Sequence, residues 1–294
     1  MADPFPRCWL NGKYLPLAEA RISPLDRGFL FADGVYEVVP IHRGRPFRLR
    51  QHLERLDRSL GEVRIRAPLS HAQWAEVIGQ LASVAAQPEV LVYVQVTRGT
   101  EFGRNHLFPP DDVEPTTFAF ASPYPPPAAA TLERGLAGAL LEDTRWTRCD
   151  IKSIALLANV LLRQQAQELG AAEAILVRDG HVTEGSSSTV FIVRQGRLLT
   201  PPNDCSVLPG TSRDAVLELA AAWLPVDVRR FTVDELRAAD EVWIASAGRG
   251  VLPITSIDGT AIGSGRPGPA WQRMYASWQA HLDAIAGRPA LEDA

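Results

Sequence analysis

The sequence predicts a two-domain protein of the α+β or α/β class. The chain has 294 residues, which suits two domains or one large α/β domain better than one ordinary core. Four prolines fall within residues 123–127; they cannot continue a helix or a central strand and predict a stiff connector. We therefore expect a smaller N-terminal α/β domain over residues 1–122, a linker over 123–128 and a larger C-terminal domain over 129–294.

The first domain is expected to mix strands and helices. Asn11-Gly12 predicts a β-hairpin over residues 9–14. Leucines at positions 53, 56 and 60 recur at helical spacing. These patterns and similar ones predict strands over 35–41, 90–98 and 116–121, and helices over 49–63 and about 72–86.

The second domain is expected to open with a strand near 136–141. A helix over about 154–169 follows and is ended by Gly170. After it we expect strands at 174–177, 189–193, 197–200 and 241–245, helices over about 212–223 and 270–285, and a frayed end from Gly287.

Composition excludes several classes of protein. Hydrophobic residues make up 46% and charged residues 22% of the chain, as in soluble globular proteins, and the net charge of −4 gives no reason to expect nucleic acid or an anionic membrane. Three unpatterned cysteines argue against a disulfide scaffold or a zinc site and suit a reducing compartment. Residues 1–7 hold an acid and two prolines where a signal peptide needs an apolar core. No stretch approaches the ~20 apolar residues of a membrane span. We expect a cytoplasmic protein without a bound metal.

Lys152 leads directly into the apolar run 154–158. One interpretation is a lysine whose stem crosses a surface at the start of a helix. The other is an amine held where its charge is disfavoured, which makes it a nucleophile toward carbonyl groups and a candidate Schiff-base lysine.

Two further motifs suggest a phosphorylated carbonyl cofactor. Gly210-Thr211-Ser212 enters a predicted helix, where backbone N–H groups and hydroxyls can bind an anion, although an ordinary helix cap has the same sequence. Glu184 precedes a glycine and three serines in an apolar region. Turn chemistry explains the serines, but a buried acid needs a partner.

Arg55 lies one helical turn after His52, beside the apolar stripe of the helix predicted over 49–63. Its guanidinium suits a phosphate, and pairing with a surface acid fits the sequence equally well.

Several motifs together resemble the fold-type IV pyridoxal-phosphate-dependent aminotransferases, and the D-amino-acid aminotransferases among them. Their order and approximate spacing match along almost the whole chain. The matching stretches are residues 26–29, 31–38, 52–56, 93–99, 148–153, 183–188 and 213–214. The resemblance implies a two-domain fold in which the larger C-terminal domain has a β-barrel-like core.

The resemblance also implies a site for pyridoxal 5′-phosphate. Lys152 would be the Schiff-base lysine, and Glu184 would face the pyridine nitrogen and keep it protonated. Phosphate would be held by Arg55, by the backbone at Thr211 and Ser212, and by Ser246. The other cofactor contacts that we expect are Ser187, Ser188, Leu208 and Ala247.

Substrate choice would rest on a second group of residues. Tyr36, Arg104 and His106 match the residues that bind the substrate carboxylate in D-amino-acid aminotransferases, and a phenol, a guanidinium and an imidazole can hydrogen-bond a carboxylate. Tyr93 would line the pocket. In the family, the equivalents of Arg104 and His106 reach in from the partner subunit, which implies a homodimer. The alternative for both is a solvated loop.

The sequence departs from the family pattern in three places. Thr211-Ser212 stands where an apolar residue and threonine are usual. The approach to Arg104 through residues 101–103 is one residue longer than the commonest form. Residues 247–249 replace hydroxyl residues with Ala, Gly and Arg, and Arg249 is expected to add a positive charge near the cofactor or substrate.

The predicted activity is ping-pong transamination between D-amino acids, such as D-alanine or D-glutamate, and 2-oxo acids. Branched-chain L-amino-acid aminotransferases, (R)-amine transaminases and aminodeoxychorismate lyase share the fold and are alternatives. The non-enzymatic alternative is a catalytically silent scaffold that forms the dimer but binds no cofactor.

Overall fold

A computed structural model describes residues 7–85 and 87–287, whose contacts form two compact units. The first unit runs to Pro125 and includes Ile151–Ala155 and the described residues from Leu282; the second comprises Pro126–Asp150 and Leu156–His281. Residues 151–155 thus group with the first unit, although they lie inside the C-terminal domain expected from the sequence. The domain limits drawn from the sequence stay a prediction. The expectations for residues 1–6 and for the tail beyond Gly287 lie outside the described residues.

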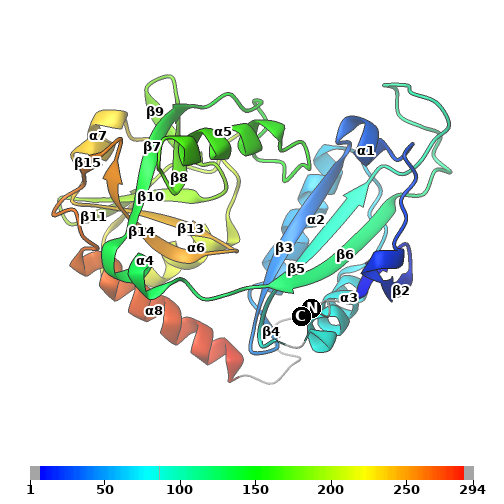
Figure 1. Cartoon of the computed structure of the whole chain (residues 1–294), viewed down its shortest axis with the longest axis horizontal. Helices are drawn as coiled ribbons and strands as arrows, with labels where there is room; N and C mark the ends of the chain where they lie inside the picture. Colours follow the sequence, from blue (N-terminus) through cyan, green and yellow to red (C-terminus); the bar gives the residue numbers. More distant parts are fainter. Residues whose placement is uncertain (1–6, 86, 288–294) are drawn as a thin grey trace. The chain divides into compact units, whose positions relative to one another are not determined.

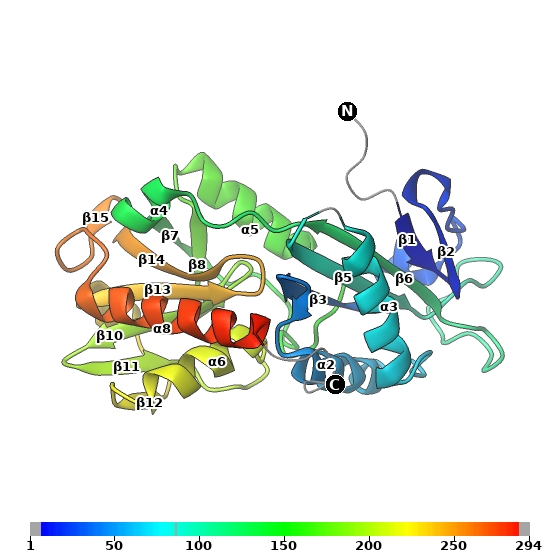
Figure 2. The same cartoon turned by 90° about the horizontal axis from the view of Figure 1, so that it is seen from below.

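The first unit is built on a six-stranded antiparallel sheet in the order β2-β1-β6-β5-β3-β4 (Figure 1). Helices α2 and α3 contact its strands and cover one face (Figure 2). The strands are β1 (Arg7–Leu10), β2 (Lys13–Pro16), β3 (Gly34–His42), β4 (Arg45–Pro46), β5 (Glu89–Thr97) and β6 (Thr116–Pro123). The helices are the 3₁₀ turn η1 (Leu17–Glu19), α1 (Arg27–Phe31), α2 (Leu49–Glu62) and α3 (His71–Val84).

Strand β3 separates the two faces of this sheet, because successive side chains of a strand point to opposite sides. Val35 and Val39 join the buried core under α2 and α3. Tyr36 lies on the other face, where its ring stacks on that of Tyr93 at 5.6 Å. The face opposite the helices is therefore aromatic and half-buried.

The second unit contains a nine-stranded sheet in the order β12-β11-β10-β13-β14-β7-β8-β9, with β15 paired to β14. Strand β9 also contacts β10, so the sheet curls back on itself, as the expected barrel-like core requires. The strands are β7 (Leu136–Glu142), β8 (Glu173–Arg178), β9 (His181–Gly185), β10 (Thr189–Arg194), β11 (Arg197–Thr200), β12 (Val226–Val228), β13 (Glu241–Ser246), β14 (Gly250–Ile257) and β15 (Thr260–Ala261). The helices are α4 (Ala129–Arg134), α5 (Leu157–Glu168), α6 (Thr211–Ala220), α7 (Val233–Arg237) and α8 (Pro269–Ala286).

The helix expected from residue 154 begins at Leu157 instead. Residues 151–155 are held extended beside β3: Ser153 forms a β-bridge with Val35, and the Ile154 N–H donates to the Gly34 carbonyl at 3.1 Å. Edge pairing thus overrides the helical pattern. Lys152 does not start a helix.

Several elements were not expected from the sequence. They are the short helices α1, α4 and α7 and the strands β9, β12, β14 and β15. Strand β14 is buried along nearly its whole length, so it lacks the alternation that marks a half-buried strand.

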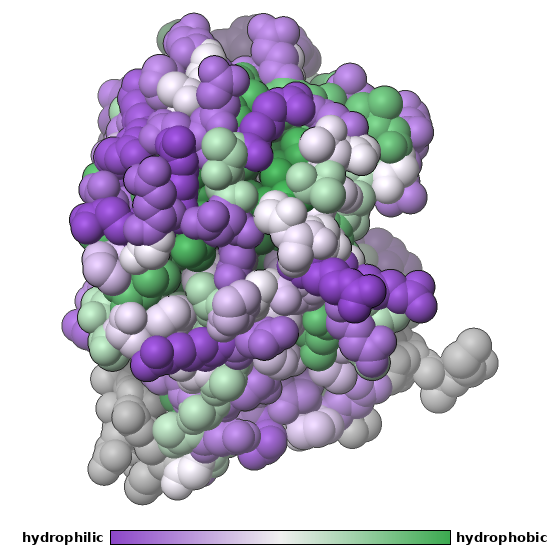
Figure 3. Space-filling view, turned by 90° about the vertical axis from the view of Figure 1, so that its left-hand side faces the viewer, coloured by the Kyte–Doolittle hydropathy of each residue, from purple (hydrophilic) through white to green (hydrophobic). Residues whose placement is uncertain are grey.

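Among the described residues, no helix is both long and apolar enough to cross a bilayer. Figure 3 faces the α7 and β15 end of the second unit and shows hydrophilic residues around smaller apolar areas.

Glu241 on β13 ties α8 to the sheet of the second unit. Its carboxylate accepts hydrogen bonds from the N–H groups of Ala270 and Trp271, at 2.9 and 2.7 Å, and from the Trp243 indole at 2.9 Å. A negative charge at a helix N-terminus that satisfies first-turn donors is stabilising.

We predict that Glu241→Gln lowers the free energy of unfolding by about 2 kcal/mol, because it removes the charge and one acceptor from buried donors. Denaturant titration at fixed protein concentration measures the change. The control is Asp234→Asn on the exposed first turn of α7, which should stay within about 0.5 kcal/mol. Equal small effects for both variants would contradict the assigned role of Glu241.

Candidate functional site

Lys152 is fixed through its backbone. Its carbonyl accepts the Tyr36 N–H at 2.9 Å, and its own N–H donates to Ser59 Oγ at 3.2 Å. The side chain is half-buried, and Nζ lies 4.3 Å from the centre of the Tyr36 ring. A primary amine is thus held over the aromatic face of the first unit.

Glu37 lies on the opposite face of β3, with its side chain only 1% exposed. It accepts Arg55 Nε at 2.7 Å, Arg55 Nη2 at 2.9 Å and His52 Nδ1–H at 2.8 Å. Burial opposes the charge on Glu37, yet Arg55 and His52 hold the pKa of its carboxyl far below the usual range. Burial also lowers the pKa of His52. Arg55 is thus oriented by a buried acid, not by the surface acid that the sequence allowed.

Tyr93 stands beside Tyr36 on the aromatic face. Its hydroxyl donates to Gln95 Oε1 at 2.8 Å, and its ring lies 5.5 Å from that of Phe120. Burial raises the pKa of Tyr93 above its ordinary value. This phenol therefore stays protonated at neutral pH.

Arg104 and His106 occupy a loop without helix or strand, and both are exposed. They do share a support: the Arg104 guanidinium lies 4.9 Å from the centre of the Phe31 ring, and the His106 ring lies 5.2 Å from it. The two side chains therefore lie on a loop that is tethered through Phe31, and their carboxylate-binding role stays a prediction.

Glu184 is buried in the second unit and has protein partners that the sequence did not reveal. One carboxylate oxygen accepts Arg145 Nη1, and the other accepts the Leu208 N–H at 3.1 Å. Burial raises the pKa of the Glu184 carboxyl, and the charge of Arg145 works against that rise. The partners that a buried acid needs therefore include Arg145 and the Leu208 N–H, and the role of Glu184 toward a pyridine nitrogen stays a prediction.

Arg145 is itself held by a second buried acid. Asp143 accepts Arg145 Nε and Nη2, both at 2.8 Å, and also Thr183 Oγ1 at 2.9 Å. Burial opposes the charge of Asp143, but its bonds to Arg145 keep the pKa of its carboxyl below the usual range. Arg145 thus joins Asp143 to Glu184.

The serine turn, Gly185–Ser188, is organised by Glu173, which is fully buried. Glu173 accepts the Ser186 hydroxyl, the Ser186 N–H at 3.1 Å and Ser188 Oγ at 3.2 Å. Ser187 is exposed, unlike its two neighbours. A carboxylate behind the turn therefore fixes which serine faces outward.

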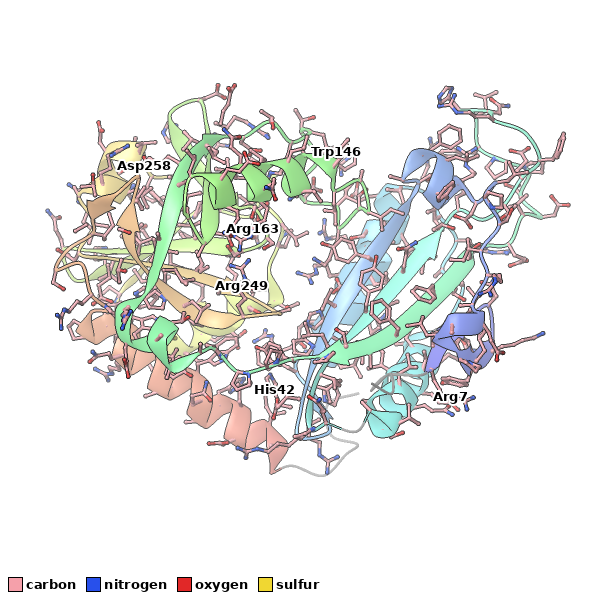
Figure 4. The ribbon with its side chains drawn as sticks, in the orientation of Figure 1. Arg7, His42, Trp146, Arg163, Arg249 and Asp258 are labelled. Atoms are coloured by element: carbon pink, nitrogen blue, oxygen red, sulfur yellow. The ribbon has the colours of Figure 1, made fainter. Side chains whose placement is uncertain are left out.

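Arg249 supplies a positive charge to this acid. Its Nη1 donates to Glu173 Oε2 at 2.9 Å, and Nη2 lies 3.4 Å from Ser187 Oγ. Burial and the charge of Arg249 lower the pKa of Arg163 on α5. Both side chains are labelled in Figure 4. Ser246, the last residue of β13, and Ala247, in the turn that follows it, are half-buried.

The first turn of α6 has no side-chain cap, because its N-cap residue is Gly210. Thr211 and Ser212 are buried in this turn. Ser212 Oγ is buried without a hydrogen-bond partner among the described residues. A buried hydroxyl next to helical N–H groups is suited to an anion.

Sequence reasoning missed four charged residues of these clusters: Glu37, Asp143, Arg145 and Glu173. An acid among the apolar positions of β3, opposite a helix that carries His52 and Arg55, was a usable signal for Glu37. Arg145 and Glu173 lie in segments without a periodic pattern that would mark them. Among the described residues, no group of His, Cys, Asp and Glu is arranged to hold a metal ion.

Comparisons with known proteins show which family this chain resembles. A family model described as amino-transferase class IV matches residues 34–257. The D-alanine aminotransferase of Staphylococcus aureus (strain MSSA476) is 36% identical over 279 residues, covering 95% of this chain and 98% of that protein. That of Bacillus licheniformis is 39% identical over 270 residues, covering 92% and 94%.

Solved structures share the fold expected from the sequence. The Escherichia coli branched-chain amino acid aminotransferase has a TM-score of 0.87 at 24% identity and covers 98% of this chain and 97% of its own. A second branched-chain amino acid aminotransferase, from T.th. and solved with pyridoxamine 5′-phosphate, has a TM-score of 0.87 at 25% identity, covering 97% and 95%.

We predict that Glu37→Gln lowers the free energy of unfolding by about 3 kcal/mol at pH 7, because buried Arg55 loses the charge of Glu37. The folded pKa of Glu37 lies below its unfolded value of about 4.3, so its contribution is complete above that pH and is lost as the pH falls toward the folded value. The gap between wild type and variant should be constant above about pH 5 and narrow below it. Urea titrations across this range measure the gap.

The control is Glu54→Gln on the exposed side of the same helix, where Glu54 pairs with Arg50 at 3.3 Å. Exposed pairs contribute about 0–1 kcal/mol. A Glu37 effect no larger than the Glu54 effect would show that buried Arg55 does not depend on the charge of Glu37.

Proposed function

This chain belongs to the class IV amino-transferases, and from that premise we propose that it transfers amino groups between D-amino acids and 2-oxo acids. The cofactor of the family is pyridoxal 5′-phosphate. The observation that carries the D-specific proposal is the match to relatives named D-alanine aminotransferase, at 36% and 39% identity over nearly their full length. Arg104 and His106, which match the carboxylate-binding residues of that group, support it.

The residues of the second unit fit the cofactor. The buried Ser212 hydroxyl without a partner and the N-terminal turn of α6 suit a phosphate. Burial raises the pKa of Glu184, so a further positive neighbour, such as a protonated pyridine nitrogen, would favour its ionised form. We assign Thr211, Ser212 and Ser246 to the phosphate, Glu184 to the ring nitrogen, and Ser187, Ser188, Leu208 and Ala247 to the surrounding contacts.

The chemistry that bound pyridoxal phosphate supplies is an aldehyde that accepts the amino group and a ring that delocalises electrons from the substrate carbon. Lys152 Nζ would hold the cofactor covalently. The same amine would carry a proton to and from the reacting carbon. The backbone bonds of Lys152 to Tyr36 and Ser59 limit where Nζ can travel.

Arg55 is proposed as a second phosphate residue. Glu37 holds its guanidinium in one orientation through two bonds, so less side-chain entropy is lost when an anion binds. Arg145 is proposed to orient Glu184. Asp143 holds the Arg145 guanidinium, and the guanidinium donates to the Glu184 carboxylate. Tyr36 and Tyr93 are proposed to line the substrate pocket.

Arg249 was expected to add charge near the cofactor or substrate. Its bond to the fully buried Glu173 engages the guanidinium. We propose that Arg249 stabilises the serine turn instead of contacting the substrate directly.

We also propose a homodimer in which Arg104 and His106 complete the partner's site. Both side chains are exposed on the single chain. Helix α5 presents Leu157, Val160 and Leu161 with exposed fractions of 72%, 60% and 61%, and residues at this spacing share one face. A cytoplasmic location is consistent with three free cysteines, Cys8, Cys149 and Cys205.

We predict that the purified holoenzyme loses absorbance at its cofactor band when D-alanine is added and regains it with pyruvate or 2-oxoglutarate. L-Leucine should leave the band unchanged. Lys152→Ala should remove the imine band and lower turnover by at least ~10³-fold, as expected for loss of a covalent and proton-transferring group. Stopped-flow absorbance measures both.

Lys152→Arg keeps the charge and is the matched control; it should be as inactive as Lys152→Ala. Bleaching by L-leucine but not D-alanine would replace the proposal by branched-chain L-aminotransfer, the activity named for the structural relatives. Bleaching by (R)-1-phenylethylamine but not D-alanine would favour an amine transaminase. Failure to take up pyridoxal phosphate would support a silent scaffold.

We predict that Leu161→Glu lowers the solution mass from twice the 32.1 kDa of the chain to a single copy, because it places a charge on the apolar face of α5. Light scattering after size-exclusion chromatography measures the mass. Gln167→Glu, on the same helix and already exposed and polar, is the control and should stay dimeric. A dimeric Leu161→Glu protein would show that this face lies outside the interface.

A further inference from the structure

Residues 100–108 carry the proposed carboxylate ligands Arg104 and His106. Side chains of Asp26–Phe31, which is helix α1 with its N-cap residue, contact this loop. The proposed reaction gives these residues no role. We propose that Arg27 and Phe31 are positioning residues that hold the 100–108 loop so that Arg104 and His106 can meet a substrate carboxylate. The inference rests on the proposed function for its substrate, but its structural part can be tested alone.

Arg27 is the first anchor. Its side chain is only 5% exposed; Nε donates to Asp33 Oδ2 at 2.9 Å and Nη1 donates to the Asn105 carbonyl at 2.7 Å. Asn105 stands between Arg104 and His106 in the chain. A buried guanidinium therefore grips the loop at the residue that separates its two functional side chains.

Asp33 orients this grip. It also accepts Arg98 Nε and Nη2, at 2.8 and 2.9 Å, while Arg98 donates further to the Val63 and Arg64 carbonyls at the end of α2. One carboxylate thus fixes two arginines, of which Arg98 is tied to α2 and Arg27 to the loop.

Phe31 is the second anchor. The guanidiniums of Arg27 and Arg104 both lie 4.9 Å from its ring centre, and the His106 ring lies 5.2 Å away. Cations at this distance from an aromatic ring are attracted by its quadrupole. Phe31 is therefore a common support for both proposed carboxylate ligands.

The base of this arrangement is rigid. Asp26 accepts the Gly28 N–H at 2.8 Å and the hydroxyls of Thr97 and Thr116 at 3.0 and 2.6 Å, which fixes α1 on β5 and β6. At the far end of the loop, Phe108 lies 3.8 Å from the Arg98 guanidinium, measured to its ring centre. The loop that carries the exposed ligands is thus held at Asn105 and at Phe108 by buried arginines, which reduces the entropy lost on carboxylate binding.

The test compares Phe31→Leu and Arg27→Lys with wild type, as holoenzymes. Phe31→Leu removes the aromatic support, and Arg27→Lys cannot reach Asp33 and Asn105 together. Phe31→Tyr keeps the ring and is the conservative control. Two quantities are measured: the rate of tryptic cleavage after Arg104, identified by mass spectrometry, and KM and kcat for D-alanine.

We expect both variants to be cut at Arg104 at least fivefold faster and to raise the KM for D-alanine at least tenfold. We expect kcat to change less than threefold and the cofactor band to stay unchanged, whereas Phe31→Tyr should behave like wild type. A general loss of structure would instead lower kcat and cofactor occupancy together.

Unchanged cleavage in both variants would overturn the inference, and so would faster cleavage with an unchanged KM. If Arg27→Lys does not fold, Phe31→Leu decides alone. If wild type itself does not turn over D-alanine, the proposed function fails, and the cleavage rates still decide whether Arg27 and Phe31 hold the loop.

Discussion

The first-unit part of the site depends on one piece of edge pairing, the backbone bonds between residues 151–155 and the start of β3. Without these bonds the apolar sequence after Lys152 would favour a continuous helix, as its pattern predicts. The Tyr36 N–H and the Ser59 hydroxyl instead fix the Lys152 backbone on both sides. A segment that pairs with a strand holds its side chains roughly perpendicular to the sheet. The bonds to β3 therefore give the Lys152 amine a defined position, although residues 151–155 form no strand of their own.

Buried acids paired with arginines form a second layer behind the proposed ligands. Glu37 holds Arg55, Asp143 and Glu184 share Arg145, and Glu173 holds Arg249. Buried ion pairs are weak sources of net stability, since desolvation offsets much of the attraction. Their effect here is orientation: each fixes a group that is proposed to touch the cofactor, or a turn that does. The clusters therefore favour preorganisation over stability.

The sequence predicted the regular elements well where periodicity was strong. Helix α2 shows this, because its leucines recur at helical spacing and the helix ends within one residue of the expected limit. It failed for α5, because pairing with β3 is a contact between residues more than a hundred positions apart. It also failed for Arg145, whose importance comes only from lying beside Asp143 and Glu184. Local patterns carry no information on such distant partners.

The same limit explains why the resemblance names the proposed ligands but not the residues that orient them. Lys152, Glu184 and Arg55 lie in motifs that can be matched along the chain. Glu173 lies outside those motifs, and its bonds to Ser186 and Ser188 arise only when β8 and the serine turn meet. Arg249 replaces a residue type usual in the family, and its pairing with Glu173 gives a physical reason why that departure can be tolerated.

Segment 27–37 contains most of the residues that arrange the part of the proposed site lying in the first unit. Phe31 and Arg27 support the loop, Asp33 orients Arg27, Tyr36 faces Lys152, and Glu37 points the other way toward Arg55. Tyr36 and Glu37 are neighbours with opposite roles, which only the alternation of a strand permits. A shift of register by one residue would exchange their faces, burying the phenol and exposing the acid. The pairing of β3 with β5, from Gly34 opposite Thr97 to His42 opposite Glu89, therefore sets the chemistry of the site as well as the fold.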